Sequence, residues 1–293
     1  MTGSRASIIE KVTYKLRLYR LSARLREIRI SRLVATVSSK LVSNRTTPFF
    51  YNEADLEDEK VFVFWAQGES EMPVGVRACF DSVKKNCGKR RVVFIDMNNL
   101  GEWVTLPSFV LSKLNDGVLS IVHFSDIVRF CLLEKYGGWW LDATVFLSHQ
   151  LPSAMGLFSV KSHSAKGFVS KGMWSGFIWH MPKDYPLAVY LKRFLFNWWS
   201  QPDATLPDYF FIDYCIRWFY LNNKPFQKQI DELPFSNPEL YFFQSPICET
   251  AFNAEEWQRI AKGTCFFKTN YKLHPPVPGS YRATILAPAL CLI

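Results

Sequence analysis

The residue types best suited to chemistry lie in one short segment, HFSDIVRFCLLEKYGGWWLDATVFL, at residues 123–147. Its first part has the apolar spacing of a helix, for which Ser125 is the expected N-cap. That helix carries Asp126 and Arg129 three residues apart. Gly137-Gly138 then supplies a left-handed stop, and WWLDATVF is predicted to form one strand that carries Asp142. Arg129 offers fork-shaped donors to an oxyanion, and Asp142 offers a hard oxygen to a divalent cation.

The estimated lengths of the helix and the strand predict that these three side chains lie close together. The helix rises roughly 15 Å from Asp126 to Tyr136, and a returning strand covers roughly 13 Å from Gly138 to Asp142. If the strand packs back along the helix, Asp142 lies level with the helix N-terminus, where the helix dipole favours anions. The three charges would then suit a sugar diphosphate and its metal. The alternative is that Asp126 and Arg129 form only an i,i+3 surface pair and that Asp142 binds nearby backbone.

The elements that must position this unit predict an α/β fold. VFVFWA at 61–66 and VVFI at 92–95 are typical of buried strands, and Pro73 begins a helical pattern between them. A strand, helix, strand succession implies a right-handed crossover and a parallel sheet. Ligands are expected at the carboxyl ends of such strands, near Gln67 and Asp96. Further along, strands are expected within 168–181 and helices at 185–200 and 208–222, with an apolar tail at 284–293 that packs on the body.

The segment SDIVRFCLLEKYGGWWLDATVF resembles the S-D-x-x-R-x-x-x-L-x-x-x-G-G-x-x-x-D-x-D signature of DXD glycosyltransferases. The resemblance is closest to the bacterial capsular polysaccharide synthesis proteins related to the outer-chain-initiating mannosyltransferases. VFVFWAQGESEMPVGVRACFDSVKKN resembles their first strand and helix, while PDYFFIDYCI and FFKTNYKL resemble a later helix and a closing segment. Together these matches cover residues 60–275.

This resemblance implies a GT-A-like nucleotide-sugar-binding fold, with a mostly parallel central sheet flanked by helices. It also implies transfer of a sugar from a nucleotide-sugar donor to a growing capsular, exopolysaccharide or other cell-surface glycan, with retention of configuration. On the matching positions, the catalytic set is Asp142, Asp126 and Arg129. Asp126 and Arg129 would hold the sugar or ribose of the donor, and Asp142 would be the first acid of the DXD.

The second acid of that motif is replaced here by Thr144. The replacement removes the carboxylate that usually binds the metal most directly, although related capsular proteins share the D-A-T form. The predicted cofactor is Mn²⁺ or Mg²⁺, with Asp142, Thr144 and His274 as its candidate ligands. Either such a cation or fixed positive side chains must neutralise the charge that develops on the leaving diphosphate.

Several further residues are candidates for binding the donor or the acceptor. Lys268 and Lys272, four apart in the closing segment, could fold over the pyrophosphate, although an ordinary solvated lysine pair is an equal alternative. The predicted donor-binding residues are Trp65, Gln67, Asp126, Arg129, Gly138, Lys268 and Lys272. Asp208 and Asp213 are candidate bases for the acceptor hydroxyl, with helix capping as the alternative for Asp208. His123 is expected to line the core. Trp174 and Trp179 could stack on a sugar face, with core packing as the alternative.

The positive charge of the chain is confined to its N-terminal segment. Residues 1–45 hold eleven basic and two acidic side chains, which account for the whole net charge of +9. We therefore divide the chain into a basic helical arm at 1–45 and a neutral glycosyltransferase domain at 46–293. The arm is expected to be helical up to about Leu33, with Leu18, Leu21, Leu25 and Ile28 on one stripe. It is interpreted as a membrane-surface helix, a partner-docking arm or a mitochondrial transit peptide.

Composition limits the classes of protein that the chain can be. With 293 residues, of which 48% are hydrophobic, it can bury a large core, and it has no apolar run long enough to span a membrane. Seven scattered cysteines without C-x-x-C spacing predict reduced thiols in a cytoplasmic protein. The basic arm adds the expectation of a peripheral position at the inner face of the membrane.

The expected partners are a nucleotide-sugar donor, a glycan or lipid-linked saccharide acceptor and an anionic membrane surface. No nucleic acid is expected, because the body lacks excess positive charge. Two alternatives stay open: a non-catalytic GT-A-like protein that binds a sugar nucleotide or glycan, and a nucleic-acid-binding protein that acts through its basic arm.

Overall fold

The computed structural model describes residues 10, 14–16, 18–41, 59–163, 169–272 and 274–287. The predictions for residues 1–9, 11–13, 17 and 42–45 of the arm, and for 288–293 of the apolar tail, lie outside these described residues. The described start of that tail falls in helix α11 (Tyr281–Leu286), which packs against α3 (Val74–Asn86).

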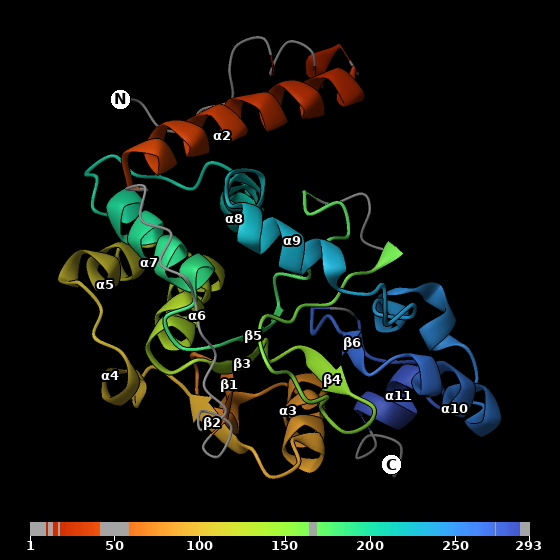
Figure 1. Cartoon of the computed structure of the whole chain (residues 1–293). Helices are drawn as coiled ribbons and strands as arrows, with labels where there is room; N and C mark the ends of the chain where they lie inside the picture. The colour runs from red at the N-terminus through yellow and green to blue at the C-terminus, as the bar shows by residue number, and fades with distance from the viewer. Residues whose placement is uncertain are drawn as a thin grey trace.

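A four-stranded sheet in the order β2-β1-β3-β5 forms the centre of the molecule. Strand β1 (Lys60–Phe64) pairs in parallel with both β2 (Arg91–Ile95) and β3 (Gly138–Leu141), whereas β5 (Ile178–Met181) is antiparallel to β3 (Figure 1). Helix α3 makes the crossover between β1 and β2. The prediction of an α/β fold with a mostly parallel sheet flanked by helices is therefore confirmed.

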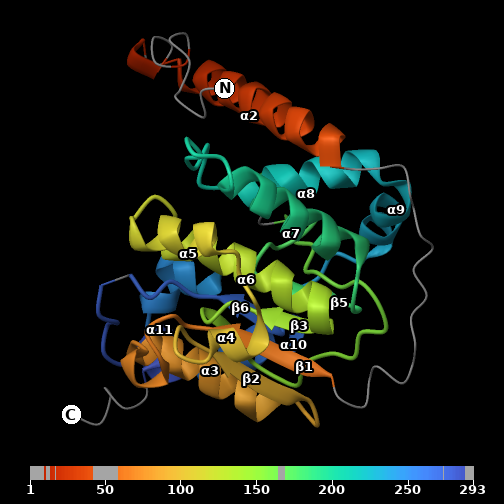
Figure 2. The same ribbon diagram turned by 90° about the vertical axis from the view of Figure 1, so that its left-hand side faces the viewer.

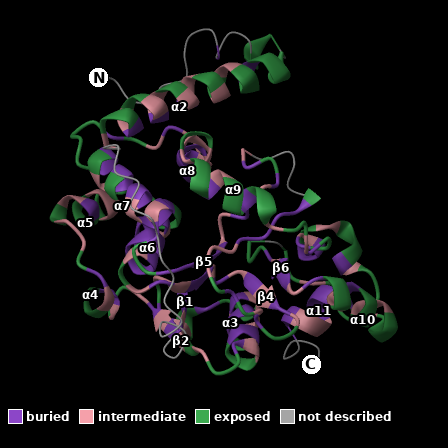
Figure 3. Cartoon of the chain, viewed as in Figure 1, coloured by how far each residue is buried: buried purple, intermediate pink, exposed green. Residues whose placement is uncertain are grey.

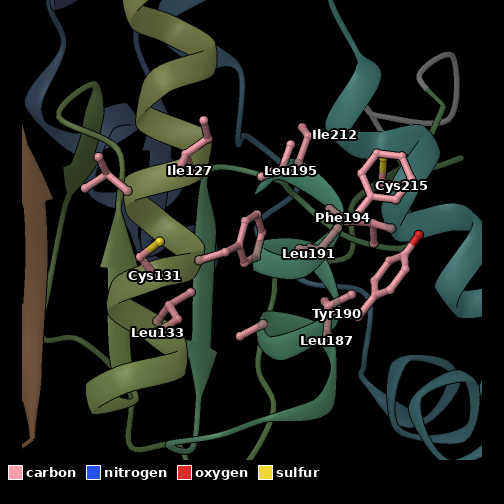
Figure 4. Close-up of a cluster of buried hydrophobic side chains, with 14 of the residues drawn as sticks. Ile127, Cys131, Leu133, Leu187, Tyr190, Leu191, Phe194, Leu195, Ile212 and Cys215 are labelled. Atoms are coloured by element: carbon pink, nitrogen blue, oxygen red, sulfur yellow. The ribbon is translucent and has the colours of Figure 1, made fainter. Parts of the chain in front are cut away.

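The two faces of the sheet are covered by different layers. Phe62 and Phe64 of β1 belong to a core shared with α6 (Ile121–Tyr136), α7 (Pro186–Trp199) and α8 (Phe211–Asn222). Figure 4 shows how the apolar side chains of these three helices meet. Val61 and Val63 point to the opposite face, where they pack with residues of α3 and of a second sheet. That sheet pairs β4 (Val145–Leu147) with β6 (Phe266–Lys268) in antiparallel fashion.

Shorter elements complete the layers seen in Figure 2. They are helices α4 (Leu100–Trp103), α5 (Ser108–Asn115), α9 (Lys224–Glu232) and α10 (Ala254–Gly263), and 3-10 turns at Glu69–Glu71, Phe242–Gln244 and Pro246–Glu249. Within the described ranges, no helix is both long enough and apolar enough to cross a membrane.

The N-terminal helix α2 (Tyr19–Leu41) lies across α7 and α8 (Figures 1 and 2). It ends at Leu41 rather than near Leu33, because its second half packs on the body: Ile30 and Val34 are fully buried, and the Ser38 hydroxyl lies 2.7 Å from the Tyr190 hydroxyl. The proposed boundary at residue 45 stays a prediction, but the described part of the arm shares the core of the body.

The face of α2 that is buried differs from the predicted stripe. The buried side chains are Ser22, Ile30, Val34 and Ser38. Leu21 and Ile28 are 46% and 41% exposed. Figure 3 shows α2 with exposed and intermediate residues along much of its length. An apolar and basic surface is thus presented away from the body.

Candidate functional site

A cavity of about 540 Å³ opens at the carboxyl ends of β1 and β3. Its wall includes Gln67 after β1, Asp126 and Arg129 from α6, Asp142 after β3, and Lys268 at the end of β6. The strand order predicted a ligand near Gln67 and Asp96; Gln67 lines the cavity, whereas Asp96 does not. The volume falls within the range of small-molecule sites, about 300–1,000 Å³.

Helix α6 starts earlier than predicted. Ser120, in an extended conformation, is its N-cap and accepts a hydrogen bond from the backbone of His123. Ser125 lies inside the first turns, where its hydroxyl donates to the Val122 carbonyl at 2.6 Å. The prediction of Ser125 as the N-cap is therefore wrong: the helix gains a turn that carries exposed Ile121 and Val122, which the apolar periodicity did not include.

The diglycine that ends α6 has a structural role. Gly137 and Gly138 have φ values of 66° and 86°, and a Cβ on Gly138 would lie 2.5 Å from the Lys60 carbonyl oxygen. Both residues therefore allow β3 to turn back from the helix and pack closely beside β1. Gly138 was predicted to bind the donor, but it does not line the cavity.

The segment WWLDATVF is not one strand, as predicted, but two. β3 ends at Leu141, and the chain turns through Asp142, Ala143 and Thr144, closed by a 2.9 Å hydrogen bond from the Val145 amide to the Asp142 carbonyl. The chain then enters β4, which pairs with β6 and therefore belongs to the second sheet. The turn places Asp142 and Thr144 together in the cavity wall.

Arg129 joins the two carboxylates that the sequence singled out. Its guanidinium donates to Asp126 Oδ1 at 2.8 Å and to Asp142 Oδ1 at 2.9 Å, with only 5% of the side chain exposed. Trp140 Nε1 adds a second donor to Asp142 Oδ1, at 2.8 Å. The predicted convergence is confirmed, and the alternative of a solvated surface pair is wrong. The catalytic roles of the three residues stay predictions.

Lys268 completes this charged cluster from the second sheet. Its ammonium donates to Asp142 Oδ2 at 3.0 Å and to Thr144 Oγ1 at 2.7 Å. Burial raises the pKa of Asp142, but the charges on Lys268 and Arg129 outweigh burial and hold it below its usual value. For Asp126, burial outweighs the opposing charge of Arg129, so its pKa is raised. Asp142 is therefore the firmly ionised carboxylate of the pair.

A third carboxylate faces the cavity from α8. Asp213 Oδ1 accepts a hydrogen bond from Trp174 Nε1 at 2.9 Å, and burial raises its pKa to about 6. Both residues line the cavity. Asp208, the other base candidate, does not: it accepts from the Phe210 amide at 2.8 Å and pairs with Arg26 at 3.6 Å.

Aromatic side chains also line the cavity. Trp65 and Tyr271 meet edge to face with ring centroids 5.2 Å apart, and Tyr209 is 64% exposed. His123 also lines the cavity, and its ring bonds the Ser120 hydroxyl. Tyr209 and Tyr271 were not among the predicted site residues, because nothing in their spacing distinguishes them from packing aromatics. Trp179, by contrast, is fully buried in the core.

The remaining predicted residues divide into those at the cavity and those away from it. Gln67 and Lys272 line it. His274 does not: it is exposed, and its Nδ1 lies 3.2 Å from the Arg282 guanidinium, a cationic neighbour that disfavours metal binding. Among the described residues, no group of three or more His, Cys, Asp or Glu side chains is placed to hold a metal ion.

Comparison with known proteins assigns the chain to a family. The model of the family described as "Capsular polysaccharide synthesis protein" matches residues 14–282. The chain belongs to this family. No curated protein matches it. A solved structure titled "PaToxG Glycosyltransferase" is similar with 14% sequence identity and a TM-score of 0.40, covering 81% of this chain and 94% of that one.

The span of the capsular polysaccharide synthesis family match exceeds the 60–275 range of the resemblance noted in the sequence. It begins before α2 and ends within α11. The family unit therefore includes the helix that we separated as an arm, in agreement with the packing of α2 on α7 and α8.

Proposed function

We propose that this member of the capsular polysaccharide synthesis family is a glycosyltransferase with a GT-A-like fold. It would move a sugar from a nucleotide-sugar donor to a cell-surface glycan. The observation that carries the proposal is the cluster of Asp126, Arg129, Asp142 and Lys268 in the cavity wall, of which the first two are buried and the last two half-buried. Fixed cations beside an ionised carboxylate are suited to a leaving nucleoside diphosphate, whose charge develops in the transition state.

The cavity offers a place for each part of the reaction. The diphosphate would lie against Lys268 and Lys272, and the donor sugar against Asp126 and Arg129. Trp65 and Gln67, at the end of β1, would contact the nucleoside. Asp213 would accept the proton of the acceptor hydroxyl as the new glycosidic bond forms on the same face of the sugar that the diphosphate leaves, which retains configuration.

A screen of nucleotide sugars tests this proposal. We expect at least one UDP-, GDP-, ADP- or CDP-sugar to raise the melting temperature of the full-length protein and to be hydrolysed or transferred. Anomeric analysis of the product then checks retention. Stabilisation without turnover by any donor would favour the alternative of a non-catalytic binding protein. Steeply salt-dependent binding of nucleic acid, with no response to nucleotide sugars, would favour the other alternative.

The Asp213→Asn variant separates a base from a structural carboxylate. The native pKa of about 6 exceeds the usual value of 3.8, so the native state binds more protons than the unfolded state between these pH values. Stability therefore falls as pH rises through this window, and the ionised carboxylate is unfavourable above it. We expect Asp213→Asn to leave the melting temperature at neutral pH unchanged or higher, while lowering transfer about 100-fold.

The pH dependence of transfer provides the matching check for Asp213. Transfer by the wild type should rise with pH through about 6, as the carboxylate ionises. The residual activity of Asp213→Asn should lack this step. Full activity in the asparagine variant would show that Asp213 is not the base.

We also propose that α2 holds the enzyme at an anionic membrane surface, where a lipid-linked acceptor would be found. Leu21 and Ile28 are exposed on its outer side, next to the exposed basic residues Arg20, Arg24 and Arg32. Apolar contact and attraction to acidic headgroups act together in such helices, with about 1 kcal/mol for each basic residue near the surface.

Charge reversal tests this membrane contact better than deletion of residues 1–45, because Ile30 and Val34 belong to the core. We expect the Arg20→Glu/Arg24→Glu variant of the full chain to bind phosphatidylglycerol vesicles at least about tenfold more weakly than the wild type. A matched reversal at exposed Arg259 and Lys262 of α10 should leave vesicle binding unchanged. Equal losses in the two variants would indicate a general charge effect and no specific membrane face.

A further inference from the structure

Lys268 lies at the position where the sequence motif predicts a divalent cation. Its ammonium bridges Asp142 Oδ2, at 3.0 Å, and Thr144 Oγ1, at 2.7 Å, which are the first and third side chains of the D-A-T motif. These are the two oxygen atoms that a metal bound to this motif would need. The ammonium therefore occupies the shared coordination position of the two predicted ligands.

The second sheet fixes Lys268 in this place. Lys268 pairs with Val145 in the β4–β6 ladder, and its amide donates to the Leu240 carbonyl at 2.7 Å. The next residue, Thr269, donates from its amide to the Thr144 carbonyl at 2.8 Å. The ammonium also lies 4.5 Å from the centroid of the Phe177 ring, and the side chain is only 19% exposed. Backbone and side-chain contacts both hold the lysine against the motif.

The donor set does not fit a divalent metal ion. Asp142 Oδ1 already accepts from Arg129 and Trp140, and Oδ2 accepts from Lys268. Mg²⁺ in phosphate sites is bound through one or two carboxylates together with water and substrate oxygens, but both oxygens of the carboxylate in this motif already face the cations Arg129 and Lys268. A divalent ion would also lie beside two fixed cations, which repel it. The other predicted ligand, His274, lies outside the cavity.

We propose that the Lys268 ammonium takes the place of the divalent cation and binds the donor diphosphate directly. Two of its three N–H donors meet Asp142 and Thr144, and the third donates to a diphosphate oxygen. Asp142 then serves to orient and desolvate the lysine rather than to ligate a metal. Lys272, also in the cavity wall, supplies a second positive charge to the diphosphate. This inference rests on the proposed glycosyltransferase function.

Calorimetric titration of the full-length wild type with UDP, GDP, ADP and CDP, in EDTA and in millimolar Mn²⁺, tests the inference without any substitution. We expect at least one nucleoside diphosphate to bind, with the same Kd in both buffers. Binding that requires Mn²⁺ would overturn the role of Lys268 and leave the glycosyltransferase proposal standing. Binding of none of the four in either buffer would overturn the proposed function and the inference with it.

Variants then identify the lysine as the responsible group. We expect Lys268→Ala to weaken nucleoside diphosphate binding about 10- to 100-fold, the range for loss of a charge-assisted hydrogen bond. Lys228→Ala on α9, which removes an exposed lysine paired with Glu232, is the matched control and should bind as the wild type does. Unchanged binding by a folded Lys268→Ala protein, as judged by its melting curve, would contradict the proposal.

A double variant converts the site to the ordinary form of the motif. Lys268→Ala/Thr144→Asp vacates the cation position and provides the second carboxylate, so it should bind the nucleoside diphosphate in Mn²⁺ and lose binding in EDTA. The wild type should bind the nucleoside diphosphate with the same affinity in Mn²⁺ and in EDTA. A double variant with the same affinity in both buffers would argue that the position is not a cation site.

Discussion

Transfer by the Asp142→Asn variant is expected to fall about 10³-fold, the upper range for removal of one preorganised electrostatic group from an active site. Asp142 is the ionised carboxylate that holds the Arg129 guanidinium on one oxygen and the Lys268 ammonium on the other. An asparagine can accept from only one of these cations and presents an N–H group to the other. At least one of the two cations should then leave the position from which it contacts the donor. The measurement is kcat/KM with the donor found in the screen.

Asp81→Asn provides the control for the loss of one carboxylate. Asp81 is an exposed residue of α3 that pairs with Lys84 at 2.8 Å and does not line the cavity. Its variant should transfer sugar at the wild-type rate. If Asp142→Asn or Asp142→Ala is also fully active, the catalytic assignment of this cluster is wrong.

Replacement of Arg129 by methionine should give the largest loss of stability among the substitutions proposed for the site. Arg129 is 4% exposed, and its guanidinium donates hydrogen bonds to both Asp126 and Asp142. Methionine keeps much of the volume but leaves Asp126 without its counter-charge and Asp142 with only Lys268. Removal of one partner from a buried ion pair costs about 3–5 kcal/mol. Urea unfolding, followed by circular dichroism, measures this change in the free energy of unfolding.

Arg259→Met is the matched control for this substitution. Arg259 forms a pair of the same i,i+3 spacing with Glu256 at 2.6 Å, but on the exposed surface of α10. Solvent and salt screen such a pair, so its loss should change the unfolding midpoint little. Similar midpoints for the two variants would show that the Arg129 cluster does not support the fold.

The unit around α6 and β3 was predictable because local rules govern it. Apolar periodicity, a diglycine stop and the rise per residue of a helix and a strand suffice to bring Asp126, Arg129 and Asp142 to one point. The hydrogen bonds of Arg129 confirm that estimate. The same rules did not locate the first residue of the helix. Ser125 and Ser120 are both residue types that cap helices, and in the folded protein Ser120 is the N-cap.

Residues contributed by distant segments were harder to assign. The sequence identified Asp208 and Asp213 as base candidates, with helix capping as the alternative for Asp208, and the packing of α8 places only Asp213 in the cavity wall. The sequence predicted an apolar stripe on α2 but not which face packs on the body, and Leu21 and Ile28 of that stripe are exposed. A helix with imperfect amphipathicity does not reveal which side packs, since tertiary contacts can bury Ser22 and Ser38 instead of leucines.

The sequence by itself determined the α/β class, the confinement of the net positive charge to residues 1–45 and the meeting of three charged side chains. Each of these follows from composition or from spacings within a short segment. Only the tertiary structure decided that Lys268 fills the cation position of the D-A-T motif. That contact joins residues 126 positions apart through the β4–β6 pairing. The register between distant strands depends on the packing of the whole core, and no local spacing specifies it.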